Sequence, residues 1–343
     1  MWSEQLTTGH AYARSDLKAA WEAERLPHAL LFTGEAGIGK ADLALWLVCL
    51  RWCQADEGPC GVCPSCKKVL TGNHPDFELV RRDPPAETDP RGLGSRLEIT
   101  VAQVREGLIP GLSLAAVEGG GRSVLIRSAE DLNEQAQNAL LKTLEEPPSG
   151  TLLLLVTARE DALLDTIRSR CQEVRLWPLS PAEMTVATPH EDPLLLGLAR
   201  GRPGRLNALR ALDVGALLQA FDGLLARPVA GTAFGTLLEE LIEAASTEEG
   251  DVEQLTLHQI VLEALHARIR DLALLGDGGA PDDLITGAVP LTAAEPLPMD
   301  VLHGLEAAIF EAGHDLRRHL PPAVAWAALG CEFVSVLVGG SAP

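Results

Sequence analysis

Basic residues, aromatic residues and long apolar runs are all scarce in this sequence. Lys and Arg total 28 against 48 Asp and Glu, which gives a formal net charge of −20. A protein that binds DNA by itself needs clustered basic residues to neutralise phosphates, so this acidity argues against a broad DNA-binding surface and favours protein partners. Aromatic residues make up only 4% of the chain.

Neither a membrane span nor a signal peptide is evident in the sequence. The longest wholly aliphatic stretch, Leu152–Val156, is far too short to cross a bilayer. The N-terminal residues lack the basic-then-apolar pattern of a secretory signal. We therefore expect a cytoplasmic protein without membrane association.

The order of apolar and helical patterns divides the chain near residue 178. Before that point, short apolar runs typical of buried parallel strands alternate with helical patterns. The runs are His28–Thr33, Phe77–Val80, Ser123–Ile126 and Thr151–Val156. Residues 82–96, rich in Pro and polar side chains, are interpreted as a surface loop. Amphipathic helical patterns then continue from about residue 192. We predict an α/β domain with a mostly parallel sheet, followed by an all-helical region.

A glycine-rich stretch follows the first apolar run and precedes an apolar helical pattern. This context is that of a P-loop, G-x-x-x-x-G-K-[ST], in which backbone N–H groups surround phosphates and the lysine contacts phosphate oxygens. The candidate phosphate-binding residues are Gly34, Gly37, Gly39 and Lys40. The last motif position is Ala41, which has no hydroxyl to hold Mg²⁺. The pattern predicts a P-loop that has lost metal-dependent hydrolysis, and leaves open whether nucleotide still binds.

The segment after Ser123–Ile126 is where a P-loop ATPase carries the acidic residues of its Walker B motif. Here Ser128 and Ala129 follow the strand, and the carboxylates of Glu130 and Asp131 come later. Ser128 with Asp131 fits a capping box for the next helix, and displaced catalytic acids are the alternative. We favour the capping box. The Walker B position would then be the second place, after Ala41, where a group that holds Mg²⁺ is missing.

Four of the seven cysteines lie close together in the sequence. They are Cys53, Cys60, Cys63 and Cys66. Four thiolates at this spacing can surround one tetrahedral Zn²⁺, and because four protein ligands close the site, the metal would be structural. An iron–sulfur centre is the less favoured alternative. We interpret His74 as a structural turn residue rather than a ligand. The remaining cysteines are expected in the core: Cys49, Cys171 and Cys331.

Arg170 stands in the tripeptide Ser-Arg-Cys, directly after a short helical pattern. In isolation, an arginine at such a place is most simply a surface residue or a salt-bridge partner. The alternative is an arginine finger that reaches the γ-phosphate of a nucleotide bound by a neighbouring subunit.

These motifs together resemble the AAA+ clamp-loader subunits of bacterial DNA polymerase III. The stretches that carry the resemblance are Arg25–Lys40, the four cysteines, Asn73–Asp76, Asn138–Pro148 and Thr166–Cys171. The resemblance is specific over about residues 20–180 and weak beyond. It implies a AAA+ α/β domain with the zinc module inserted at 53–66, over residues 1–178. A small helical lid at 179–210 and a helical collar for oligomerisation at 211–343 would follow.

The family contains active ATPases, the tau/gamma subunits, and a branch that typically lacks one or both metal-binding features. Counting back from Asn138, Ser128 and Ala129 take the positions where an active member carries Asp and Glu. Gly204 stands where the second sensor segment carries its arginine. The resemblance therefore implies a non-catalytic subunit that donates Arg170 in trans to ATP on a neighbour.

The partners that the resemblance implies are the tau/gamma and delta subunits in a five-subunit assembly. Through that complex the chain would act on the sliding clamp and primed DNA. Two other hypotheses remain. An active tau/gamma-type ATPase would hydrolyse ATP by itself, and a zinc-dependent nucleic-acid-binding module would need a basic surface that the composition does not favour.

Overall fold

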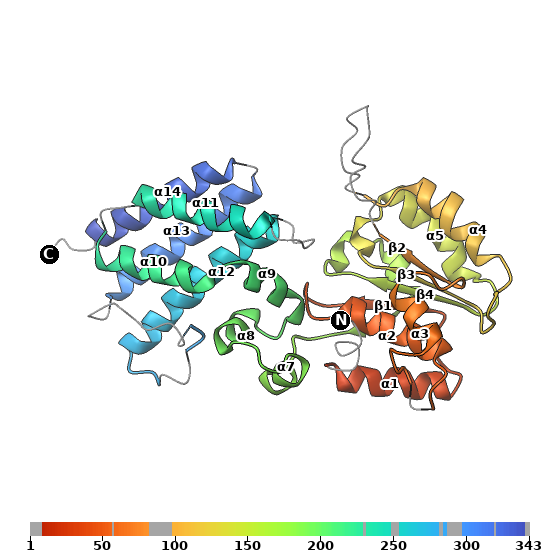
Figure 1. The fold of residues 1–343 in the computed structure, drawn as a ribbon. Coiled ribbons are helices and arrows are strands. Elements are labelled where there is room, and N and C mark those ends of the chain that lie inside the picture. The colour runs from red at the N-terminus through yellow and green to blue at the C-terminus, as the bar shows by residue number, and fades with distance from the viewer. Residues whose placement is uncertain are drawn as a thin grey trace. The chain divides into compact units, whose positions relative to one another are not determined.

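The computed structural model describes residues 9–56, 58–81, 98–228, 231–247, 254–280, 284–286, 297–318 and 320–339. The predicted surface loop at 82–96 therefore lies outside the described residues. The chain divides into two compact units (Figure 1). The first contains residues 1–189 and 201–203, and the second contains residues 190–200 and 204–343. The proposed division of the helical part into a lid and a collar stays a prediction.

A five-stranded sheet forms the centre of the first unit. Its strands are β1 (Ala29–Thr33), β2 (Phe77–Val80), β3 (Arg122–Ile126), β4 (Thr151–Val156) and β5 (Gln172–Arg175). Their order is β2-β3-β4-β1-β5, and every neighbouring pair is parallel. The predicted parallel α/β fold is confirmed, although β5 was not predicted.

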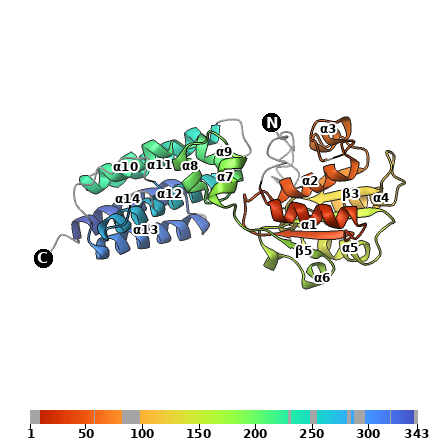
Figure 2. The same ribbon diagram turned by 90° about the horizontal axis from the view of Figure 1, so that it is seen from below.

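Helices cover both faces of this sheet (Figure 2). One face packs against α1, α2 and α3, and the other against α5 and α6. The α-helices described in this unit are α1 (Ala11–Glu22), α2 (Lys40–Trp52), α3 (Pro64–Leu70), α4 (Ile109–Leu112), α5 (Glu134–Glu145), α6 (Asp165–Arg168) and α7 (Pro181–Ala187), and a π-helix covers Gln103–Leu108. Because β1 and β4 are buried along their whole length, their side chains can be apolar at every position.

The second unit is built from helices, as the sequence patterns predicted. They are α8 (Pro193–Ala199), α9 (Leu206–Ala211), α10 (Val214–Ala226), α11 (Gly231–Thr247), α12 (Gln254–Gly276), α13 (Met299–Arg317) and α14 (Pro322–Gly339). Phe221, Phe234 and Phe333 form an aromatic cluster in its core. A buried ion pair between Arg268 and Asp222 joins α12 to α10.

Helix α14 packs against α11 and α13 within this unit. Among the described residues it alone has the length and apolar composition of a membrane span, a property that core helices of soluble proteins share. Trp326 and Phe333 on one face are fully buried. Cys331 is exposed, so its predicted place in the core is wrong. Side chains two residues apart on a helix point in nearly opposite directions, so Cys331 faces away from the side that buries Phe333.

Candidate functional site

The predicted P-loop lies between β1 and α2, as its sequence context indicated. Helix α2 begins at Lys40. Gly34, Gly37 and Gly39 have positive φ angles of 130°, 79° and 96°. A Cβ atom on Gly34 would lie 2.4 Å from the backbone oxygen of Leu176, so the turn into the loop requires glycine.

Lys40 turns back onto the loop that precedes it. Its Nζ donates to the carbonyl oxygens of Gly34 at 2.7 Å and Glu35 at 2.5 Å, and the residue is only 6% exposed. Burial lowers the pKa of Lys40 to about 8, while the carboxylates of Glu130 and Glu35 partly oppose this shift. Carbonyl groups of the loop therefore hold the ammonium group of Lys40 against the loop.

The lowered pKa of Lys40 predicts how stability changes with pH. Below about pH 8 Lys40 is protonated in both the folded and the unfolded chain, and burial of its charge destabilises the folded chain by the full amount. Between about pH 8 and 10.5 the unfolded chain binds more protons, so the free energy of unfolding rises with pH. The shift corresponds to about 3 kcal/mol. We expect this rise to be absent in Lys40→Met, measured by urea unfolding across that range. The same rise in the free energy of unfolding in the wild type and in Lys40→Met would contradict this prediction.

The segment after β3 does not cap the next helix. Ser128 makes no capping hydrogen bond through its side chain, and residues 129–131 form a short 3-10 turn. Helix α5 is instead capped by Asn133, whose side chain accepts from the N–H of Ala136 at 2.9 Å. The predicted capping box of Ser128 and Asp131 is therefore wrong, because the 3-10 turn delays the start of the helix.

Glu130 is a carboxylate near the P-loop that the sequence interpretation set aside. Its Oε1 accepts a hydrogen bond from the N–H of Ala158, which follows β4, at 3.1 Å. Its charge also raises the pKa of Lys40. Ser128 and Ala129 supply no carboxylate, and Ala129 is fully buried. The signal in the sequence was a glutamate within four residues of a buried strand.

Arg202 is a second residue at the P-loop that the sequence interpretation missed. Its Nη1 lies 3.4 Å from Oε2 of Glu35. Arg205 pairs instead with Glu263 inside the helical unit. The sequence interpretation named Gly204, and nothing in the sequence distinguishes Arg202 from Arg205 as the residue that contacts the P-loop.

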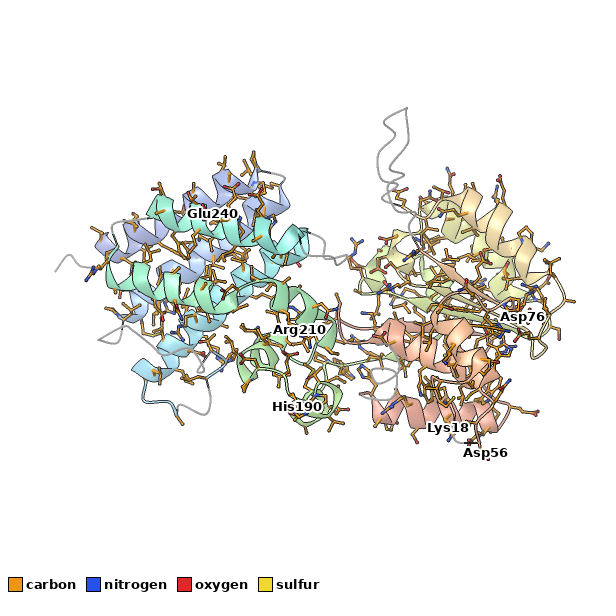
Figure 3. All side chains as sticks on the ribbon, in the orientation of Figure 1. Lys18, Asp56, Asp76, His190, Arg210 and Glu240 are labelled. Atoms are coloured by element: carbon orange, nitrogen blue, oxygen red, sulfur yellow. The ribbon has the colours of Figure 1, made fainter. Side chains whose placement is uncertain are left out.

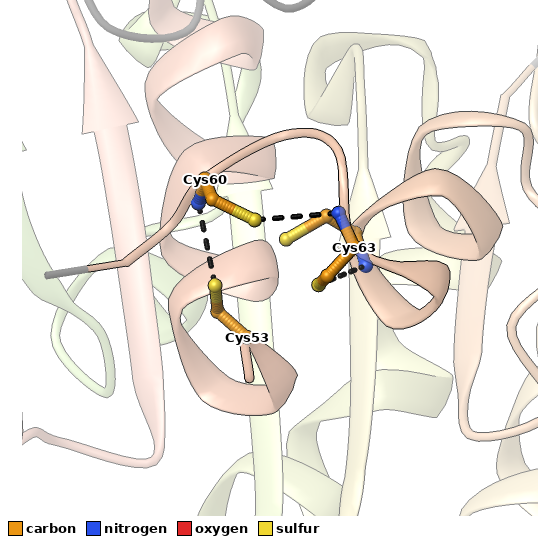
Figure 4. Close-up of side chains that lie close together, drawn as sticks. Cys53, Cys60 and Cys63 are labelled. Atoms are coloured by element: carbon orange, nitrogen blue, oxygen red, sulfur yellow. Dashed lines mark hydrogen bonds between the residues drawn. The ribbon is translucent and has the colours of Figure 1, made fainter. Parts of the chain in front are cut away.

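The four predicted zinc ligands come together in one cluster, and Figure 4 labels three of them, Cys53, Cys60 and Cys63. The sulfur atoms of Cys53, Cys60, Cys63 and Cys66 all lie within 4.8 Å of one another. Tetrahedral Zn²⁺ with four thiolates places its sulfurs about 3.8 Å apart. The donor set therefore fits a closed four-thiolate site.

Backbone N–H groups surround the cluster in a way that favours thiolates. The N–H of Cys60 donates to Sγ of Cys53 at 3.3 Å, and that of Cys63 donates to Sγ of Cys60 at 3.3 Å. The N–H groups of Val62 and Cys63 lower the pKa of Cys60. A Cβ atom on Gly58 would lie 2.6 Å from Sγ of Cys53, so the chain can approach the cluster only with glycine there. Such outer contacts are typical of metal thiolate sites.

The predicted structural role of His74 is confirmed. Its ring is buried and stacks on Trp52 with centroids 4.1 Å apart, and its Nδ1 accepts from the N–H of Asp76 at 3.2 Å. Asp76, labelled in Figure 3, accepts from the N–H groups of Val117 and Glu118 at 2.8 and 2.7 Å. These contacts fasten the strand that follows the cysteine module to the loop before β3.

Arg170 lies on the surface, on a backbone turn that buried neighbours hold in place. Ile167 is fully buried, and Cys171 packs partly buried against the same core. The Arg170 guanidinium pairs with Glu145, the last residue of α5. The salt-bridge interpretation of this arginine therefore has a partner, and Glu145 is a residue that the sequence did not identify.

The predicted site residues occupy separate parts of one unit. Lys40 is the first residue of α2 and Cys53 follows the last. A helix of 13 residues is about 20 Å long, so the P-loop and the cysteine cluster lie at opposite ends of α2. Gly34, Gly37, Gly39 and Lys40 are brought together, and the four cysteines form a second group.

The parallel sheet and the glycine-rich loop between β1 and α2 together define a P-loop α/β domain. The family model described as DNA polymerase III, delta subunit, matches residues 9–180, which is half of the chain. The chain belongs to this family. The predicted resemblance to the clamp-loader subunits of bacterial DNA polymerase III is confirmed.

The curated relatives are named as delta' and tau subunits of DNA polymerase III. Subunit delta' of Bacillus subtilis is 38% identical over 161 residues, covering 47% of this chain and 45% of that protein. Subunit delta' of Escherichia coli is 36% identical over 203 residues, covering 56% of this chain and 57% of that protein. Subunit tau of Escherichia coli is 30% identical over 240 residues, covering 67% and 35%. The chain thus spans about half the length of the delta' relatives that it matches.

Proposed function

We propose that this protein is a non-catalytic clamp-loader subunit of the DNA polymerase III holoenzyme. It would help to place the sliding clamp on primed DNA in the cytoplasm, within a five-subunit assembly with tau/gamma and delta subunits. Its contribution to ATP chemistry would be Arg170, donated to the nucleotide of a neighbour.

The observation that carries this proposal is the loss of metal-holding groups from an otherwise complete P-loop. Ala41 has no side-chain oxygen to hold Mg²⁺, and Ser128 and Ala129 replace the acidic pair after β3. Lys40 is also held by the carbonyl oxygens of Gly34 and Glu35. Without Mg²⁺ the charge between the β- and γ-phosphates is not neutralised, so hydrolysis at this loop would fail.

The cysteine cluster supports a structural role for Zn²⁺ in this unit. Cys53, Cys60, Cys63 and Cys66 would supply all four ligands, which leaves no position for substrate or water. Bound metal would therefore order the loop between α2 and α3 rather than take part in a reaction.

The purified chain should not hydrolyse ATP above background, with or without Mg²⁺. Lys40→Ala serves as the control, because it removes the lysine on which any P-loop hydrolysis would depend. We expect equal phosphate release from the wild-type chain and from Lys40→Ala. Hydrolysis by the wild-type chain that Lys40→Ala abolishes would overturn the non-catalytic assignment.

One observation favours a second candidate, an active ATPase of the tau/gamma type. The Glu130 carboxylate lies near enough to Lys40 to raise its pKa, and could serve as a displaced acidic residue. The same phosphate-release assay decides between the two candidates, because only the active ATPase requires Lys40 for turnover by the isolated chain.

A further inference from the structure

The side chain of Arg170 is held by acceptors of its own chain. Its Nε donates to Oε1 of Glu145 at 2.8 Å, and Nη2 lies 2.5 Å from the same oxygen. Its Nη1 donates to the carbonyl oxygen of Thr166 at 2.9 Å and to the Oγ of Ser169 at 3.4 Å. Each of the three guanidinium nitrogens therefore has an acceptor within this subunit.

A guanidinium group acts on a phosphate by directing its N–H donors at the phosphate oxygens. The Glu145 carboxylate has the same sign of charge as a phosphate and uses two of the three nitrogens. It also neutralises the positive charge that would attract a γ-phosphate. We propose that Glu145 holds Arg170 in a withdrawn position, from which a neighbour's nucleotide must displace it. This inference rests on the proposed trans role of Arg170.

The position of Glu145 in its helix supports this assignment. It is the last residue of α5, where the helix dipole disfavours negative charge. The stability of α5 therefore gives no reason for a glutamate there, whereas Arg170 provides one. Lys142 in the same last turn is the kind of residue that a helix end favours.

The ion pair between Arg170 and Glu145 is weak enough to open. The side chains of Arg170 and Glu145 are 34% and 50% exposed. Water screens such a pair, so its two partners separate readily. A nucleotide carrying several negative charges can compete with a single carboxylate for the guanidinium.

Glu145→Gln tests this proposal in the complex assembled with active ATPase subunits, clamp and primed DNA. The change keeps the size of the side chain and removes its charge. We expect stimulated ATP turnover to rise about two- to fivefold, the range for an exposed ion pair. The matched control is Glu146→Gln, which removes the same charge one residue further on and should leave turnover unchanged. The gain should shrink as salt is raised, because salt screens the wild-type pair.

A second measurement uses the isolated full chain and does not depend on turnover. Solvent exchange of the Arg170 Nε–H, followed by NMR, should be faster in Glu145→Gln than in wild type and unchanged in Glu146→Gln. Equal exchange in all three would overturn the contact itself.

The outcomes separate this inference from the proposed function. If Arg170→Ala abolishes stimulated turnover and Glu145→Gln leaves it unchanged or lowers it, the withdrawn state is wrong and the trans role stands. If Arg170→Ala has no effect, the trans role fails and the inference fails with it. The double variant Arg170→Ala, Glu145→Gln should match Arg170→Ala alone, because Glu145 acts only through Arg170.

Discussion

Cys66→Ser should empty the metal site and unfold the module that carries it. Cys66 is fully buried, and its sulfur belongs to the cluster with Cys53, Cys60 and Cys63. Structural zinc contributes on the order of 10 kcal/mol to the folding of small modules. Losing one of four ligands should remove most of this, because a three-thiolate site with a serine oxygen is a poor match for Zn²⁺.

Metal content measures this result directly. We expect about one zinc per chain in the wild-type protein and none in Cys66→Ser, together with a large fall in thermal stability. Cys171→Ser is the control, since Cys171 is partly buried and lies outside the cluster, and it should keep its zinc. Iron with visible absorbance would favour the iron–sulfur alternative, and metal retained by Cys66→Ser would contradict the four-thiolate site.

Arg170→Ala should lower ATP turnover at the neighbouring site by about 10³-fold or more, the usual contribution of an arginine finger. The effect should appear only in the assembled complex. Because Arg170 is on the surface and its backbone is held by Ile167 and Cys171, the variant should fold and assemble normally.

Arg168→Ala provides a control for this experiment. Arg168 lies two residues away and pairs only weakly with Asp165, at 3.3 Å on the surface. Arg168→Ala should leave ATP turnover unchanged if the effect belongs to Arg170 alone. Equal losses from both variants would indicate general damage to α6 rather than the loss of a finger.

Buried strands and sharp turns made much of the first unit predictable. β1 and β4 are apolar at almost every position because both faces of the sheet are covered. The glycines of the P-loop predicted a turn, and they have positive φ angles there. β5 was missed because it is an edge strand with mostly exposed side chains, of which Val174 alone is apolar.

The chemistry of the site was predictable where it depends on residue type and spacing, as in the cysteine cluster. It was not predictable where it depends on long-range contacts. Arg202 reaches Glu35 across 167 residues of sequence, and Glu145 reaches Arg170 across 25. Neither pairing leaves a periodic pattern. The 3-10 turn at 129–131 likewise moved the helix start away from the place that the capping pattern favoured.

We propose that this subunit acts at a neighbour's nucleotide and not at its own P-loop. The most direct test compares Lys40→Ala with Arg170→Ala in the complete complex, by single-turnover ATP hydrolysis in the presence of clamp and primed DNA. We expect that the complex with Lys40→Ala keeps the wild-type rate, whereas the complex with Arg170→Ala loses the turnover of one neighbouring site. A complex that is slowed by Lys40→Ala and unaffected by Arg170→Ala would contradict it.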